Sequence, residues 1–134
     1  MLNVLITGAS GMLGATLVNE YKNNFNVFAT GNSNFTEQYI NYKKFDLRSK
    51  SYKELIEWSD PDIIIHGGAL TNGNYCEENP NDAFNINGIS VQKFLRATNN
   101  DVKIIYISTD AVFPSSLHLA KELEFRAVIV MACD

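Results

Sequence analysis

Residues 4–14 read Val-Leu-Ile-Thr-Gly-Ala-Ser-Gly-Met-Leu-Gly, an apolar run that leads straight into a glycine loop with GxxGxxG spacing. The residues behind the loop have helical periodicity, and their apolar face consists of Leu13, Leu17, Val18 and Tyr21. A strand, a glycine turn and a helix in this order bring a pyrophosphate to the helix N-terminus. We therefore predict a dinucleotide-binding turn, with a purely structural glycine turn as the alternative.

Composition limits the other classes of function. The chain has 134 residues, of which 46% are hydrophobic and 19% charged, as in an ordinary single globular domain. Its formal net charge of −4 favours neither nucleic acid nor an anionic membrane as a partner. Cys76 and Cys133 lack metal-ligand spacing, so we expect reduced thiols, no metal and a cytoplasmic location. We also expect neither a signal peptide nor a membrane-spanning segment, because the apolar runs are short.

The rest of the chain alternates apolar strands with amphipathic helices. After the first strand, we expect strands at residues 26–30, 42–45, 62–66 and 102–107, and helices near Tyr52 and after Asn79-Pro80. This order predicts an α/β fold, a Rossmann-like doubly wound parallel sheet in three layers. Ligands of such sheets bind beyond the carboxyl ends of the strands. Those ends carry Gly8, Gly31, Asp46, Gly67 and Thr109.

Four further stretches carry a family resemblance. They are residues 61–69 (Pro-Asp-Ile-Ile-Ile-His-Gly-Gly-Ala), Thr71 with residues 76–80 (Cys-Glu-Glu-Asn-Pro), residues 83–87 (Ala-Phe-Asn-Ile-Asn) and residues 107–113 (Ile-Ser-Thr-Asp-Ala-Val-Phe). With the glycine loop, they resemble the extended short-chain dehydrogenase/reductases, and most of all the dTDP-4-dehydrorhamnose reductase family. The resemblance covers residues 1 to about 113. The regulatory β-subunit of methionine adenosyltransferase has the same pattern but serves as a partner protein.

The resemblance implies that a nicotinamide dinucleotide lies along the carboxyl edge of the sheet. The backbone amides of Ser10, Gly11, Met12 and Leu13 would hold its pyrophosphate, beside Gly8 and Gly14. Asp46 and Leu47 match the adenine contact, although Asp46 could instead cap its own loop. Gly67, Gly68 and Ala69 would leave room for the adenosine ribose, and Thr71 and Ser108 lie in motifs of the same site. Asn87 either hydrogen-bonds across the sheet or caps a buried backbone group.

The segment after the second strand usually selects the cofactor. An acidic side chain there binds the ribose hydroxyls of NAD, and a basic one accommodates the phosphate of NADP. Here Asn32 and Ser33 are neither acidic nor basic. Because no carboxylate is present to bind the ribose hydroxyls of NAD, we favour NADP over NAD. These two residues could also be ordinary turn residues.

The catalytic residues fit the family only in part. The resemblance implies that the Thr109 hydroxyl binds the substrate carbonyl, and that a tyrosine four residues before a lysine supplies the proton. No tyrosine follows Tyr106, and the residue four positions before Lys121 is Leu117. Lys121 is therefore either the retained cofactor lysine or a solvated helix charge. We expect this chain to bind cofactor without turnover.

Residues 114–134 depart most from the family pattern. They read as a helix and a buried strand, which are either the catalytic helix and sixth strand joined early by deletion, or unrelated sequence. We expect no substrate-binding region. Three functions stay open: an NAD(P)-dependent reductase of a nucleotide-sugar 4-ketone, a non-catalytic dinucleotide-binding regulatory subunit, and a truncated relic. In the relic, a partner or a second copy would cover the open sheet edge.

Overall fold

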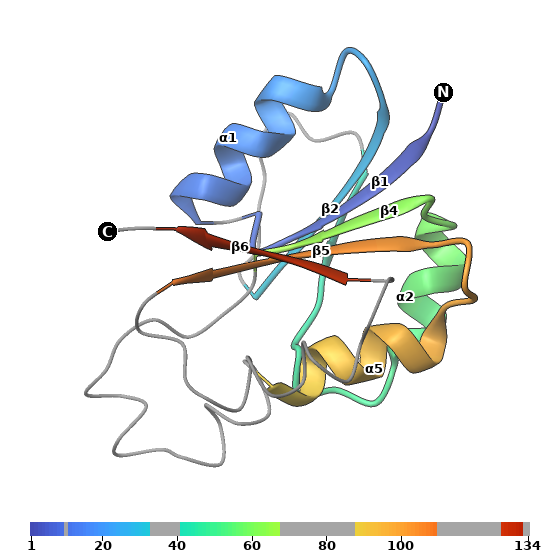
Figure 1. Ribbon diagram of the computed structural model, residues 1–134. Helices are drawn as coiled ribbons and strands as arrows, with labels where there is room; N and C mark the ends of the chain where they lie inside the picture. The colour runs from blue at the N-terminus through green and yellow to red at the C-terminus, as the bar shows by residue number, and fades with distance from the viewer. Residues whose placement is uncertain (10, 33–40, 68–87, 110–126, 133–134) are drawn as a thin grey trace.

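A computed structural model describes residues 1–9, 11–32, 41–67, 88–109 and 127–132, with the backbone alone at residues 12–13, 108–109 and 127–132 (Figure 1). Six strands form one sheet in the order β3-β2-β1-β4-β5-β6, and every neighbouring pair is parallel. The strands are β1 (Asn3–Thr7), β2 (Asn26–Gly31), β3 (Tyr42–Lys44), β4 (Ile63–His66), β5 (Lys103–Thr109) and β6 (Ala127–Ala132). This is the strand order of a doubly wound dinucleotide-binding sheet, so the predicted fold class is confirmed.

Helices cover both faces of the sheet, which gives the three predicted layers. The helix α1 (Met12–Tyr21) lies on one side, and α2 (Tyr52–Ser59) and α5 (Ser90–Ala97) lie together on the other (Figure 1). The predicted helix start at Asn79-Pro80 lies outside the described residues. Among the described residues, no helix is long and apolar enough to cross a membrane.

The core is divided by the sheet into two clusters. Because successive side chains of a strand point to opposite faces, Val4 and Ile6 pack with Val18 of α1, whereas Leu5 packs with Leu55 of α2 and Phe94 of α5. All six side chains are at most 2% exposed. The two interleaved clusters therefore fix the register of the central strand, because a shift by one residue would exchange its two faces.

The last strand settles part of the prediction for the tail. β6 runs parallel to β5, from Ala127 beside Ile104 to Ala132 beside Thr109. A strand thus exists where the sequence predicts one. The helix predicted before it falls in residues 110–126, which lie outside the described residues.

Candidate dinucleotide site

The turn between β1 and α1 has a defined backbone shape. Gly8 has a φ of 72°, in the left-handed region that favours glycine. The amide of Gly11 donates a hydrogen bond to the carbonyl oxygen of Gly8 at 3.0 Å, which closes the turn. The amide of Ala9 donates to the carbonyl oxygen of Thr30 at 3.0 Å, which ties the turn to the end of β2.

The first turn of α1 packs directly on this loop. A Cβ added to Gly14 would lie 2.1 Å from the carbonyl oxygen of Gly8 and 2.8 Å from the Cα of Ala9, so only glycine fits. The first turn of α1 contains no acidic residue. Its leading N–H groups lack partners within the helix, and together with the helix dipole they attract an anion. The start of α1 therefore presents N–H groups beside Gly8, as anion-binding helix N-termini do.

The ends of β2 and β3 lie next to this turn. Gly31 is buried at the end of β2, and Asn32 behind it is exposed. The amide of Phe45 donates to the carbonyl oxygen of Gly31 at 2.8 Å, which brings the segment after β3 alongside β2. Asn32 and Asp46 thus follow two neighbouring strands at the same edge, as the parallel order requires.

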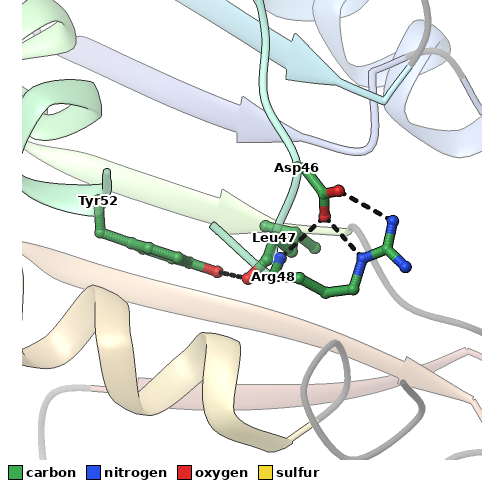
Figure 2. Close-up of polar contacts among 4 residues, drawn as sticks. All are labelled: Asp46, Leu47, Arg48 and Tyr52. Atoms are coloured by element: carbon green, nitrogen blue, oxygen red, sulfur yellow. Dashed lines mark hydrogen bonds and ion pairs between the residues drawn. The ribbon is translucent and has the colours of Figure 1, made fainter. Parts of the chain in front are cut away.

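Asp46 is held by Arg48 (Figure 2). Its Oδ1 accepts hydrogen bonds from the Arg48 amide at 2.9 Å and from Nε at 3.0 Å, and its Oδ2 accepts one from Nη2 at 2.9 Å. These bonds from Arg48 lower the pKa of the Asp46 carboxyl below its ordinary value. The alternative that Asp46 caps its own loop is therefore confirmed. The adenine contact of Asp46 stays a prediction, and the sequence interpretation missed Arg48, although the Asp-x-Arg spacing was visible.

Leu47 is fixed by its backbone. The phenol of Tyr52 donates a hydrogen bond to the carbonyl oxygen of Leu47 at 2.6 Å (Figure 2). Tyr52 is 4% exposed, and its ring packs edge-on against Phe45 and Phe94 at centroid distances of 5.0 and 4.8 Å. Burial raises the pKa of this phenol, which stays protonated. The loop after β3 is therefore held in place by the core.

The end of β4 carries a buried histidine. His66 is 0% exposed, with Nδ1 hydrogen-bonded to Thr7 Oγ1 at 2.6 Å and Nε2 to Ser90 Oγ at 2.8 Å. Burial lowers its pKa to about 3, so the ring is neutral. A Cβ added to the next residue, Gly67, would lie 3.2 Å from the carbonyl oxygen of Thr7. His66 is thus packed inside the protein, and the sequence interpretation missed its partner Ser90.

Ser108 and Thr109 lie at the carboxyl end of β5, opposite Met131 and Ala132 of β6. The structure therefore brings five predicted groups to one sheet edge: the glycine turn, Asn32, the Asp46–Leu47 loop, Gly67 and the end of β5. The remaining predicted site residues lie outside the described residues: Ser10, Ser33, Gly68, Ala69, Thr71, Asn87 and Lys121. In the part of the chain that is described, no group of three or more His, Cys, Asp or Glu could hold a metal ion.

Comparison with known proteins finds a matching family and two similar curated relatives. A family model described as the RmlD substrate binding domain matches residues 2–125. The chain is 31% identical over 115 residues to the spore coat polysaccharide biosynthesis protein SpsK of Bacillus subtilis, which covers 84% of this chain and 38% of that relative. It is 32% identical over 113 residues to the methionine adenosyltransferase 2 subunit beta of Xenopus tropicalis, covering 81% of this chain and 33% of the relative. The chain thus spans 33–38% of the length of these curated relatives.

Two solved structures are similar over nearly the whole chain. A hypothetical dTDP-4-dehydrorhamnose reductase from Sulfolobus tokodaii has a TM-score of 0.80 and 27% identity, and the match covers 98% of this chain and 56% of that one. The dTDP-4-dehydrorhamnose reductase of Bacillus anthracis in complex with NADP has a TM-score of 0.76 and 24% identity, covering 99% of this chain and 54% of that one. The second likeness bears on the fold alone.

Proposed function

The chain belongs to the family of the RmlD substrate binding domain, and from this premise we propose that it binds a nicotinamide dinucleotide at the carboxyl edge of its sheet. The observation that carries the proposal is the close approach of Gly14 to Gly8, because an added Cβ would lie 2.1 Å from the Gly8 carbonyl oxygen. The amides of Ala9 and Gly11 are used within the fold, so the N–H groups of the first turn of α1, which lack partners within the helix, are the ones that would bind a pyrophosphate.

Each part of the edge would hold one part of the cofactor. The turn from Gly8 to Gly14 would bind the pyrophosphate, the Asp46–Leu47 loop the adenine, and Gly67 would leave room for the adenosine ribose. We assign NADP rather than NAD because Asn32, and no acid, follows Gly31 at the end of β2. A bound nicotinamide would supply a hydride.

We propose that this chain does not catalyse turnover. Thr109 could bind a substrate carbonyl at the end of β5, and Lys121 could hold the nicotinamide ribose, but Leu117 stands where the family has its proton-donating tyrosine. Without that phenol, the chain has no general acid at the family's position to protonate the alkoxide as the hydride is transferred, so the reaction would lose this catalytic contribution. We therefore do not propose the reaction implied by the family resemblance, reduction of a nucleotide-sugar 4-ketone, for this chain alone.

A second candidate is a regulatory subunit that binds a dinucleotide and a partner protein. The similarity to the methionine adenosyltransferase 2 subunit beta favours it, together with the missing tyrosine. β6 is the last strand of the described sheet, and its edge is where a partner or a second copy would pair. Analytical ultracentrifugation at rising concentration tests this: association supports the candidate, and a clean monomer at high concentration counts against pairing between copies.

Fluorescence titration tests the main proposal. We expect saturable binding of NADPH, tighter than that of NADH, and no steady oxidation of NADPH when dTDP-4-keto-6-deoxymannose is added. Failure of both cofactors to bind would contradict the site. Turnover at about 1 per second or faster would contradict the loss of catalysis.

A further inference from the structure

A chain of three buried polar side chains runs beneath the proposed cofactor site. His66 of β4 is hydrogen-bonded through Nδ1 to Thr7 of β1 at 2.6 Å and through Nε2 to Ser90 of α5 at 2.8 Å. All three residues are at most 1% exposed. These hydrogen bonds thus link the end of β4 to the end of β1, 59 residues away in sequence, and to the start of α5, 24 residues away.

The surroundings of His66 restrict its ring to one orientation. The ring stacks on Tyr106 at a centroid distance of 5.3 Å and an interplanar angle of 22°. Phe94 of α5 meets it edge-on at 5.1 Å. A ring turned away from the two hydroxyls would leave its nitrogens against aromatic carbon, and burying a polar atom without a partner is costly. The two hydroxyls and the two aromatic rings therefore fix the orientation of the imidazole.

The ends of β1 and β4, which these hydrogen bonds join, both lead directly into the proposed site. Thr7 precedes Gly8, which has a φ of 72° at the start of the glycine turn. His66 precedes Gly67, where an added Cβ would lie 3.2 Å from the Thr7 carbonyl oxygen. A change in the spacing of β1 and β4 at this point would move the pyrophosphate turn relative to the proposed ribose position.

We propose that His66, acting through Thr7 and Ser90, is a positioning residue that sets the spacing between the glycine turn and Gly67 for cofactor binding. This inference rests on the proposed function, since it concerns the same site. His66 is not a catalytic residue, because it is fully buried and lies beneath the strand ends. Its effect on the cofactor is transmitted through the backbone of the two strands.

Variants that remove one hydroxyl at a time, with little change in side-chain size, test the proposal. Thr7→Val and Ser90→Ala each remove a hydroxyl that bonds to His66, and Thr7→Ser is the conservative variant that keeps the hydroxyl. Ser59→Ala is a matched control, because Ser59 is also 0% exposed and donates a hydrogen bond at 2.9 Å to Leu55, far from His66 in the fold. We expect Thr7→Val and Ser90→Ala to raise the Kd for NADPH by about 3- to 30-fold well below their Tm. Thr7→Ser and Ser59→Ala should bind as the wild type does.

A second readout needs no cofactor. In the ¹⁵N–¹H spectrum of the unliganded protein, Ser90→Ala should shift the amide resonances of Gly8 and Gly67, whereas Ser59→Ala should leave them in place. A merely structural role would lower the Tm of Thr7→Val and Ser90→Ala with the Kd unchanged, and that result would overturn the inference. If wild-type protein binds neither NADPH nor NADH, the proposed function fails. The amide shifts then test the positioning role by itself: unmoved Gly8 and Gly67 resonances overturn it, and shifted ones support a His66 that sets the spacing of the two strand ends for a ligand other than these cofactors.

Discussion

The carbonyl oxygen of Gly8 occupies the place that a side chain at Gly14 would need, because a Cβ built there lies 2.1 Å away. This close approach joins the loop after β1 to the first turn of α1, so the loop and the helix behave as one unit. The same loop is tied to β2 through the hydrogen bond from Ala9 to Thr30 at 3.0 Å. The glycine turn is thus held from two sides before any ligand binds.

Gly14→Ala should disrupt this turn. The clash is with backbone atoms, which cannot rotate away, so we expect a loss of about 1–3 kcal/mol in the free energy of unfolding and loss of NADPH binding. Thermal unfolding and fluorescence titration measure the two effects. Gly11→Ala is the comparison for stability alone: its Cβ would lie 3.3 Å from the same oxygen and its φ is −84°, so it should cost less free energy of unfolding than Gly14→Ala. Equal stability and equal affinity of Gly14→Ala and wild type would contradict this packing.

The buried imidazole of His66 predicts a pH dependence of stability. Burial lowers its pKa to about 3, whereas an unfolded histidine titrates near about 6.5. Between these values the unfolded chain binds a proton that the folded chain does not. The free energy of unfolding should therefore fall as the pH drops below about 6.5, by up to about 1.4 kcal/mol per pH unit, and His66 should contribute no slope above that pH.

Urea unfolding at about pH 7, 6 and 5 measures this slope. His66→Gln removes the titrating group and should flatten the dependence, while His118→Gln controls for the loss of a histidine as such. A His66→Gln variant with the wild-type slope would show that other groups cause the pH dependence.

The ion pair of Asp46 and Arg48 should matter more for the ligand than for the fold. Both side chains are more than 40% exposed, at 42% and 45%, so Asp46→Asn should cost at most about 1 kcal/mol of stability. Because the folded-state pKa of Asp46 is lowered, its contribution is present above the unfolded pKa and is lost as the pH falls through the folded one. If Asp46 contacts adenine, the same variant weakens NADPH binding, as titration measures.

Asp101→Asn is the control for Asp46→Asn, because Asp101 precedes β5 at the opposite edge of the sheet. It should leave the affinity for NADPH unchanged. If the Asp46→Asn variant binds NADPH as tightly as Asp101→Asn does, Asp46 does not contact the cofactor.

Local patterns were enough to predict the sheet and the glycine turn. The apolar strands, the spacing of Gly8, Gly11 and Gly14, and the helix stop at Asp60-Pro61 depend on neighbours in sequence; Asp60 does end α2, with a φ of 40°. The polar links beneath the site could not be predicted in the same way. The bond between Thr7 and His66 joins residues 59 positions apart, and it exists only because β1 and β4 are adjacent in the folded sheet. The partners of His66 follow from tertiary packing alone.

The most direct test of dinucleotide binding at the glycine turn is an NADPH titration of the ¹⁵N-labelled protein. We predict saturable shifts of the Gly8, Gly11 and Gly67 amides, with the amides of Asn3 and Asp101 at the opposite edge unmoved. Saturable shifts confined to that opposite edge, or no shift at Gly8 and Gly11 at saturating NADPH, would contradict it.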